Sequence, residues 1–322
     1  MCGPQVMHAV YGDTFCAEHD QIPTRQAGSE NGIQTAGEAR RSGFGAGTGR
    51  RKLLGVAGAL GATVAGMGLL GSKPAVAATS AAGNIDKLFS RGRRVVDMSH
   101  PFGTDFPVYQ PYVASPKIWQ VASVDKEGYN TNLLTIDEHS GTHMDGPKHF
   151  SNGQITSDQI AAEDLIAPMV IIRTEERAKQ NPDALLTYDD LKKWEARYGR
   201  IPKGAIICMD NGWYKRIHTP EKIFNRDEAG HPHFPGIGWD AAEFLQSQRD
   251  VVGVATDAPS MDSGAHDVID PKAHKILLPT GHYGIEWTAN MDQLPDNGAI
   301  AVIGLLKHIG GFSGPVRMFG IY

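Results

Sequence analysis

Residues 137–150 have the sequence DEHSGTHMDGPKHF, in which metal-binding and proton-transferring side chains are unusually dense. These side chains are His139, His143, Asp145 and His149. In a straight strand, at about 3.3 Å per residue, His139 and Asp145 would lie roughly 20 Å apart, too far to share one ion. We therefore predict that the segment bends, and Gly141 or Gly146 is where its backbone can do so.

The chemistry of this segment follows from its donor atoms. Imidazole and carboxylate ligands without thiolate suit Zn, Mn or Fe(II). A bent segment allows His139, His143 and Asp145 to hold one ion, and the two oxygens of Asp145 could bridge two ions. His149, which lies four residues further on and past a proline, is then available as a general acid or base.

The composition of the whole chain supports this interpretation and excludes others. The 322 residues are 41% hydrophobic and 21% charged, and the net charge of -5 gives no basic surplus for binding nucleic acid. Three cysteines cannot build a disulfide framework or a thiolate zinc site. Thirteen histidines are unusual, because histidine binds metals and moves protons near neutral pH.

Residues 1–78 differ in composition from the rest and are predicted to be a targeting segment. Residues 1–49 are rich in Gly, Ala, Gln and Ser and are expected to be disordered. Arg50-Arg51-Lys52, a glycine-diluted apolar run at 53–70 and a small-residue stretch at 75–78 resemble a twin-arginine-type signal peptide. The alternative is an uncleaved membrane anchor, which five glycines in the run would weaken. We therefore expect export to the periplasm or the exterior, without stable membrane insertion after cleavage.

Residues 79–322 are expected to form one strand-rich domain of mixed α/β class. Short runs rich in Val and Ile predict buried strands at 94–98, 133–136, 168–172, 205–209, 251–255 and 299–303. Helical patterns occupy 185–198, where Thr187 and Asp190 form a capping signal, and 239–247. The tryptophans at 119, 213, 239 and 287 are interpreted as core or pocket-wall residues.

A second group of polar residues lies at 273–286 and includes His274, His282 and Glu286. Taken alone it is a weak signal, and it matters because the first segment lacks ligands for a second ion. Asp257 and Asp262, upstream of this group, could either orient ligands or cap turns.

Together these residues resemble the metal-dependent cyclase family, which includes bacterial kynurenine formamidases and isatin hydrolases. Residues 139–149 match the family signature His-x-Gly-Thr-His-x-Asp-x-Pro-x-His at every fixed position. Residues 97–101 are similar to its early Asp-Leu-Ser-x-Pro pattern, and 313–317 to its closing Gly-x-Pro-x-Arg pattern. Residues 253–262 resemble its central motif, with Gly253 one residue earlier than the strict spacing.

The resemblance implies a role for each matching residue. His139, His143 and Asp145 would hold one metal, and His274 with Glu286 would complete a second site that Asp145 also faces. His149 would be the catalytic acid or base. The remaining match, Tyr109, stands where formamidases place a substrate-stacking Trp, and its hydroxyl leaves the substrate open.

The resemblance also implies a fold and an activity. The family has a β/β/α swivelling-domain architecture and assembles as homodimers or homotetramers. Its implied cofactor is Zn or Mn, with one or two ions per chain. The implied reaction is hydrolysis of an amide bond in a small aromatic substrate by metal-activated water, as in the arylformamidases of tryptophan catabolism. Isatin-type opening of a cyclic amide is the alternative substrate class.

Three other classes of protein fit the sequence less well than this hydrolase. A serine hydrolase needs a Gly-x-Ser-x-Gly elbow, and the nearest match at 311–314 fails the spacing. An Fe(II) oxygenase could use His143, Asp145 and the distant His308, with Arg317 anchoring a co-substrate, but it leaves the other clustered residues without a role. A metal-binding module without turnover would not need His149.

Overall fold

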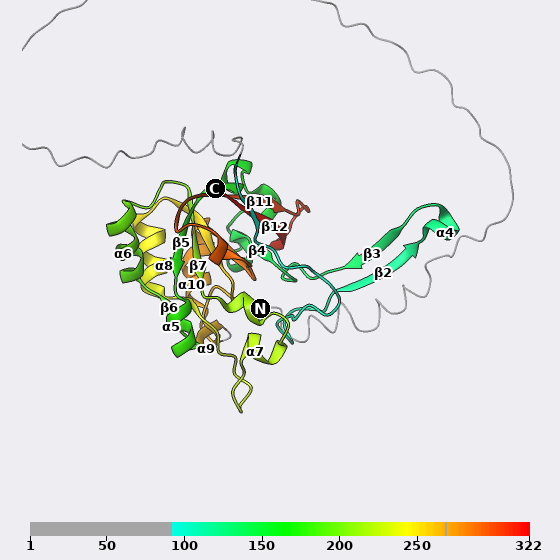
Figure 1. Ribbon diagram of the computed structural model, residues 1–322, viewed down its shortest axis with the longest axis horizontal. Coiled ribbons are helices and arrows are strands. Elements are labelled where there is room, and N and C mark those ends of the chain that lie inside the picture. The colour runs from blue at the N-terminus through cyan, green and yellow to red at the C-terminus, as the bar shows by residue number, and fades with distance from the viewer. Residues whose placement is uncertain (1–91, 268) are drawn as a thin grey trace, which may run out of the picture. The chain divides into compact units, whose positions relative to one another are not determined.

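The computed structural model describes residues 92–267 and 269–322 (Figure 1). The predicted disordered region and signal segment at 1–78 therefore lie outside the described residues. Within the described ranges, none of the helices is both long enough and apolar enough to span a lipid bilayer.

Most strands belong to one mixed sheet, which runs β1-β12-β11-β5-β7-β9-β10-β4. Its strands are β1 (Val95–Asp97), β4 (His143–Asp145), β5 (Ile166–Arg173), β7 (Ala205–Asp210), β9 (Val251–Thr256), β10 (Tyr283–Glu286), β11 (Asn297–Leu305) and β12 (Ser313–Ile321). Strands β5, β7, β9 and β10 are parallel neighbours, and the other pairings are antiparallel.

The sheet closes on itself through β4. One edge of this short strand pairs with β10, and the other pairs with the first residues of β12, so that Asp145 lies opposite both Gly284 and Ser313. All strands of this sheet except β1 thus form a barrel-like ring. Closure removes the free sheet edges that would otherwise seek another strand.

Alternation along the strands divides the buried residues into two layers. On β5, Met169 and Ile171 belong to a cluster that draws residues from every strand of the ring, whereas Val170 and Ile172 face a second cluster shared with the helices. Burial on both sides explains why these strands are continuous apolar runs. Cys208 is fully buried in the first cluster.

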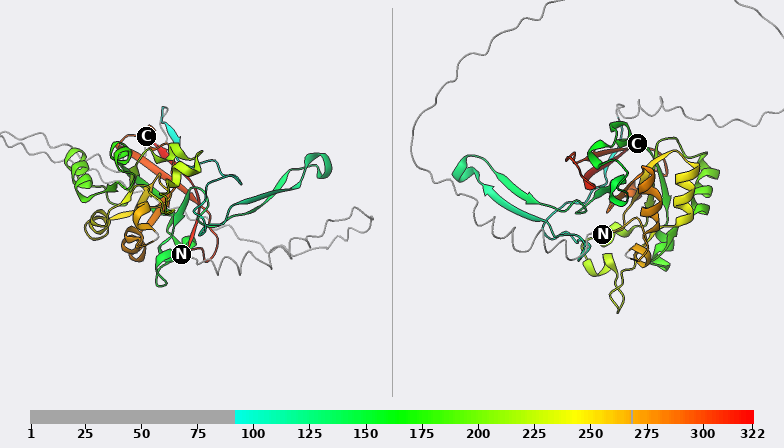
Figure 2. Two further views of the ribbon diagram at one scale, coloured as in Figure 1. Left: turned by 90° about the horizontal axis from the view of Figure 1, so that it is seen from below. Right: turned by 180° about the vertical axis from the view of Figure 1, so that it is seen from behind.

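Three helices, α6 (Tyr188–Tyr198), α8 (Trp239–Gln248) and α10 (Lys272–Leu277), contribute to that second cluster and lie along one side of the sheet (Figures 1 and 2). The predicted capping signal is confirmed, because the Thr187 side chain accepts a hydrogen bond from the backbone of Asp190 and the Asp190 side chain bonds back. The remaining α-helices are α4 (Val124–Glu127), α5 (Glu175–Gln180), α7 (Pro220–Phe224) and α9 (Gly264–Asp267). The 3-10 helices are η1 (Pro147–Phe150), η2 (Ser157–Gln159), η3 (Ala162–Leu165), η4 (Trp213–Arg216), η5 (Leu278–Thr280) and η6 (Met291–Gln293).

A two-stranded ribbon, β2 (Lys117–Ala122) with β3 (Thr131–Thr135), extends away from the barrel (Figures 1 and 2). The only other pairing outside the main sheet, within the described ranges, joins β6 (Leu185–Leu186) to β8 (Gly236–Ile237). The ribbon exposes large apolar side chains, including Val121 and Leu134.

All of the predicted strands and both predicted helices are present, so the mixed, strand-rich class is confirmed. The prediction of burial was wrong for the run at 133–136, because it forms the exposed ribbon strand β3. The interpretation of the tryptophans as core or pocket-wall residues is confirmed for three of the four. Trp213 and Trp287 are buried, and Trp239 at the start of α8 lines a small pocket, although its ring is partly exposed. Trp119 lies exposed on the ribbon, because residue type alone does not predict burial.

Candidate metal centre

The predicted bend in the 137–150 segment is present at Gly141. Its backbone has φ +73°, a left-handed conformation that favours glycine. A Cβ at this position would lie 2.7 Å from the Phe102 ring. The next residue fixes the turn, because the Thr142 hydroxyl donates a 2.6 Å hydrogen bond to the carbonyl of Trp287.

After the bend, β4 presents two side chains on one face of the sheet. His143 and Asp145 are two residues apart and share a face, whereas Met144 between them points into the barrel interior. On the neighbouring strand β10, Glu286 lies opposite His143. The two strands therefore place an imidazole and two carboxylates together on the face that points away from the barrel interior.

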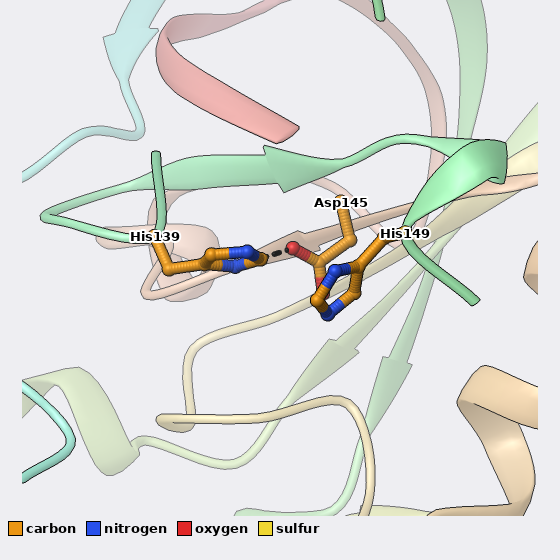
Figure 3. Close-up of side chains that lie close together, drawn as sticks. All are labelled: His139, Asp145 and His149. Carbon is orange, nitrogen blue, oxygen red and sulfur yellow. Dashed lines mark ion pairs between the residues drawn. The ribbon is translucent and has the colours of Figure 1, made fainter. Parts of the chain in front are cut away.

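One possible ligand group consists of His139, Asp145 and His149, which approach one another from the loop, from β4 and from η1 (Figure 3). One ligand atom from each lies within 4.8 Å of the others. The His139 Nδ1 atom is 2.9 Å from Asp145 Oδ1, and the rings of His139 and His149 are 4.4 Å apart. Helix η1 begins at Pro147 and turns His149 back toward the carboxylate.

A second group shares the same aspartate. His143, Asp145 and Glu286 also offer ligand atoms within 4.8 Å of one another, and all three are buried. His143 Nε2 is 3.4 Å from Asp145 Oδ1 and 3.5 Å from Glu286 Oε2. His274 on α10 joins them, since its Nε2 lies 3.1 Å from Asp145 Oδ2 and 3.4 Å from Glu286 Oε1. The structure thus brings all five predicted ligands and His149 together around Asp145.

Hydrogen bonds behind these side chains fix their orientation. The Asp262 carboxylate lies 2.7 Å from His274 Nδ1, so it orients that ring toward Asp145. The Gly141 carbonyl does the same for His143 Nδ1 at 3.0 Å. Met261 donates its backbone N–H to Glu286 Oε1.

Ser313 is a residue of the site that the sequence did not single out. Its hydroxyl donates a 3.0 Å hydrogen bond to Asp145 Oδ1, and it is fully buried at the start of β12. The signal available was its place in the closing Gly-x-Pro-x-Arg pattern, where Ser313 stands at the position of the glycine. No spacing rule in the sequence linked it to Asp145.

Asp257 and Asp262 have different roles, although the sequence allowed each of them either to orient a ligand or to cap a turn. Asp262 orients a ligand histidine. Asp257 caps a turn, because its carboxylate accepts backbone hydrogen bonds from Asn211 and Trp213 at the start of η4. Burial and the nearby Asp210 carboxylate raise the pKa of Asp257 to about 7.

The electrostatics of the cluster fit a bound cation. Burial opposes ionisation of Asp145, yet the imidazoles of His139 and His149 and two hydrogen bonds hold its pKa well below the usual range. Burial likewise opposes protonation of His143, but Asp145 and Glu286 raise its pKa to about 9. Carboxylates this buried need a positive partner, and the donors are of the imidazole and oxygen types that divalent metals bind.

An aromatic cluster adjoins the ligand groups. Its rings include Phe102, Phe106, Phe224 and Trp287, and it reaches the ligand segment where Phe102 contacts Gly141. Tyr109 packs at the far side of this cluster, with its ring 5.4 Å from that of Phe224. The Tyr109 hydroxyl is buried and makes no hydrogen bond that meets normal geometry within the described residues.

The residues that the oxygenase alternative required are engaged elsewhere. His308 Nε2 lies 2.5 Å from Glu138, and Arg317 pairs with Asp97. Neither belongs to a candidate ligand group among the described residues. That alternative therefore lacks its third ligand and its anchor.

A barrel-like mixed sheet with a bent His/Asp segment and an opposing Glu defines a class of metal-binding α/β domain. Residues 96–263 match the profile of a protein family described as "Putative cyclase". The chain belongs to this cyclase family.

Individual relatives agree with this assignment. The chain is 34% identical over 249 residues to an isatin hydrolase of Roseibium aggregatum, a match that covers 73% of this chain and 94% of that protein. It is 25% identical over 197 residues to a kynurenine formamidase of Salinibacter ruber, covering 60% of this chain and 80% of that one. The crystal structure of an isatin hydrolase bound to the product analogue thioisatinate superposes with a TM-score of 0.69 at 33% identity, covering 75% of this chain and 97% of that chain.

Proposed function

We propose that this protein is a metal-dependent hydrolase that opens a cyclic amide on a small aromatic substrate, as isatin hydrolases do. The observation that carries the proposal is the convergence of the predicted ligands and His149 around Asp145, next to an aromatic cluster. The 34% identity to an isatin hydrolase over 94% of its length favours a cyclic amide over a linear formamide.

The predicted ligands form two metal-binding positions that share Asp145. Asp145, His139 and His143 would hold one divalent ion, and His274 with Glu286 would complete a second position that Asp145 also faces. When bound, such an ion supplies an activated water for attack on the carbonyl and stabilises the negative charge that develops. Zn and Mn are the ions we propose, following the family resemblance, and the imidazole and carboxylate donors suit both.

His149 is the residue that we assign to proton transfer. Its ring lies 4.4 Å from that of His139 and 6.1 Å from that of His274, between the two parts of the ligand set. From there it can take a proton from the attacking water and deliver it to the leaving nitrogen, so that the C–N bond breaks as the nitrogen is protonated. Acid/base assistance of this kind is worth about 10²- to 10⁴-fold in rate.

The aromatic cluster supplies the substrate-binding surface. Its rings pack edge-on or tilted against one another, as in the 5.3 Å contact between Phe106 and Trp287, and an aromatic lining of this kind suits a planar bicyclic ligand. Tyr109 at its far side keeps an aromatic face and adds a polar hydroxyl.

An aryl formamide such as N-formylkynurenine is the second candidate substrate. The similarity to a kynurenine formamidase supports it, and the same attack on an amide carbonyl would apply. The test is to purify the protein, measure its metal content by elemental analysis, and assay isatin and N-formylkynurenine in parallel. Hydrolysis of isatin with the higher kcat/KM supports the proposal. Absence of metal-dependent hydrolysis of both amides would refute it.

We also propose that the protein acts as a homodimer or homotetramer with the family's swivelling-domain architecture. The β2–β3 ribbon exposes Val121, Tyr129 and Leu134, and a two-stranded ribbon is marginally stable unless another surface covers it. A second copy of the chain is the proposed cover. Light scattering of the purified protein and of a Val121→Ser, Leu134→Ser variant tests this, because the variant should shift toward monomer.

Export remains a proposal that rests on the sequence of residues 1–78. The paired arginines, the glycine-diluted apolar run and the small residues that follow support the twin-arginine route. Cell fractionation of the full chain and of an Arg50→Lys, Arg51→Lys variant provides the test. Retention of the variant in the cytoplasm is the expected result, whereas equal distribution of both proteins contradicts the route.

A further inference from the structure

The Ser313 hydroxyl differs from the other polar groups that contact Asp145. Three imidazole nitrogens lie within 3.4 Å of the Asp145 carboxylate, and they belong to His139, His143 and His274. All three are predicted metal ligands. The Ser313 hydroxyl donates a 3.0 Å hydrogen bond to Oδ1 of the same carboxylate. Among residues 92–267 and 269–322, it is the only hydrogen-bond donor to Asp145 that is not itself a predicted ligand.

This distinction matters once an ion is bound. A histidine binds a metal through the lone pair of a ring nitrogen, and that nitrogen then carries no proton to donate. The other ring nitrogens of His143 and His274 already contact the Gly141 carbonyl and the Asp262 carboxylate, so the nitrogens that face Asp145 are the ones free to bind an ion. Their hydrogen bonds to Asp145 would end, whereas the bond from the serine hydroxyl would remain.

The two oxygens of Asp145 face different ligands. Oδ1 lies 2.9 Å from His139 Nδ1, and Oδ2 lies 3.1 Å from His274 Nε2. Rotation of the carboxylate about its Cβ–Cγ bond would take both oxygens out of these directions. The hydrogen bond from Ser313 to Oδ1 opposes that rotation, so it keeps one oxygen at each of the two metal-binding positions.

The backbone of Ser313 is held on both sides of its side chain. Ser313 is fully buried at the start of β12, where it pairs with Asp145 on β4. The Glu138 carboxylate accepts the backbone N–H groups of Phe312 and Ser313, each at 3.2 Å. The Ser157 hydroxyl donates a 3.2 Å hydrogen bond to the Ser313 carbonyl. The serine is therefore anchored as precisely as an orienting group needs to be.

Glu138 links this anchor to the ligand segment. It directly precedes His139 in the chain, and its carboxylate also lies 2.5 Å from His308 Nε2. One residue thus holds the start of β12 and adjoins the first predicted ligand.

We propose that Ser313 is a positioning residue, whose hydroxyl keeps the Asp145 carboxylate turned toward both metal-binding positions while Glu138 holds Ser313 in place. This inference rests on the proposed function, because it concerns the ion that the hydrolase would bind. Ser313 acts through Asp145 alone, so loss of its hydroxyl should weaken ion binding and change the geometry around the ion.

The experiment measures the Zn²⁺ affinity of the purified protein by competition with a chromophoric chelator. Ser313→Ala should bind Zn²⁺ about 10- to 100-fold more weakly than the wild type, the usual cost of losing a group that orients a ligand. Ser99→Ala is the matched control, because the Ser99 hydroxyl also bonds to the β12 backbone, at Val316 and Met318, without contacting a ligand. Its Zn²⁺ affinity should equal that of the wild type.

A second measurement separates positioning from stability. Co²⁺ bound in place of Zn²⁺ has visible absorption bands that depend on coordination geometry, so Ser313→Ala should shift these bands and Ser99→Ala should not. Urea unfolding of the metal-free proteins measures the stability that each variant loses. Equal Zn²⁺ affinity in the wild type and Ser313→Ala would overturn the inference, and so would equal losses of affinity in the two serine variants.

Glu138→Gln tests the support of Ser313 and decides alone if Ser313→Ala does not fold. The amide oxygen can still accept one backbone N–H, but the amide nitrogen cannot, so Zn²⁺ affinity should fall by only about 2- to 10-fold. Glu176→Gln, a change at an exposed carboxylate that pairs with Lys179, is its control. Equal affinity in these two variants would overturn the role of Glu138. A wild-type protein that binds neither Zn²⁺ nor Mn²⁺ would instead refute the proposed function.

Discussion

The two halves of the metal centre are built in opposite ways. Residues 139–149 supply three imidazoles and Asp145 from one bent stretch of chain. The other half takes His274 from α10 and Glu286 from β10, and it depends on Asp262 to orient the histidine. The first half is therefore largely a local property of the sequence, and the second exists only once the sheet and helix have packed.

This difference predicts how each half responds to mutation. A change in the local half should act directly on ligand geometry. A change in the assembled half should act through packing and hydrogen bonds that support the ligands. Asp145 belongs to both halves, so its loss should affect both.

Asp145→Ala should have the largest effect. It removes the carboxylate that lies within 3.4 Å of three imidazole nitrogens, so both halves lose their common member. We expect metal content to fall to background and kcat/KM to fall by about 10³-fold or more, since metal assistance is worth several kcal/mol. Elemental analysis and the isatin assay measure both, with Asp189→Ala on the exposed start of α6 as control. Normal metal content in the variant would contradict the ligand assignment.

His149→Ala separates two roles within the local half. As an acid or base, its loss should leave the metal content unchanged and lower kcat by about 10²- to 10⁴-fold. The competing outcome is loss of metal, because one nitrogen of His149 lies within 4.8 Å of ligand atoms of His139 and Asp145. Metal titration of the variant discriminates the two: an unchanged stoichiometry supports proton transfer, and a reduced one makes His149 a ligand.

Asp262→Ala tests the assembled half. The variant keeps every ligand but loses the carboxylate that lies 2.7 Å from His274 Nδ1. Loss of such an orienting partner typically costs about 10- to 100-fold in metal affinity or activity. Competition with a chelator measures the affinity, and Asp257→Ala, which removes a turn cap, is the comparison variant. Equal losses of metal affinity in both variants would show that Asp262 acts through stability alone.

Gly141→Ala should have the smallest effect of the four substitutions, because it removes no ligand side chain, and its effect on folding can be measured directly. The new methyl group meets the Phe102 ring at 2.7 Å in a left-handed backbone, so we expect the free energy of unfolding to drop by about 1–3 kcal/mol. Gly298→Ala is the matched control, because Gly298 has φ +93° with nothing within 4 Å of an added Cβ. Urea unfolding measures how far the free energy of unfolding drops in each variant. The difference between the two drops is the contribution of the Phe102 contact, and equal drops would show that this contact contributes nothing.

The sequence predicted mainly those parts of the fold that are buried on both sides, although it also predicted the exposed ribbon strand β3. Strands such as β5 and β7 face apolar residues in both directions, so their Val and Ile runs are continuous and easily recognised. The ribbon strand β2 and the closing strand β12 lack that pattern. β12 contains Gly314, Pro315 and Gly320, which interrupt any apolar run, and two of its partners, β1 and β4, are distant in the chain, so no continuous Val and Ile run indicated it.

The same reasoning explains what the sequence revealed of the site. The spacing of His139, His143 and Asp145 and the need for a bend at Gly141 or Gly146 were visible without a structure, and the structure places the bend at Gly141. The contribution of Ser313 was not visible, because it depends on a contact across the fold, the 3.0 Å hydrogen bond from Ser313 to Asp145. Long-range hydrogen bonds leave no periodicity in the sequence that could be recognised.

The strand that carries His143 and Asp145 also completes the ring, since β4 bonds to β10 on one edge and β12 on the other. An ion held by these side chains favours the folded chain over the unfolded chain by mass action. Chains without the ion would then unfold more often and be degraded sooner. In a living cell, the abundance of this enzyme, and not merely its turnover, would track the local supply of the metal.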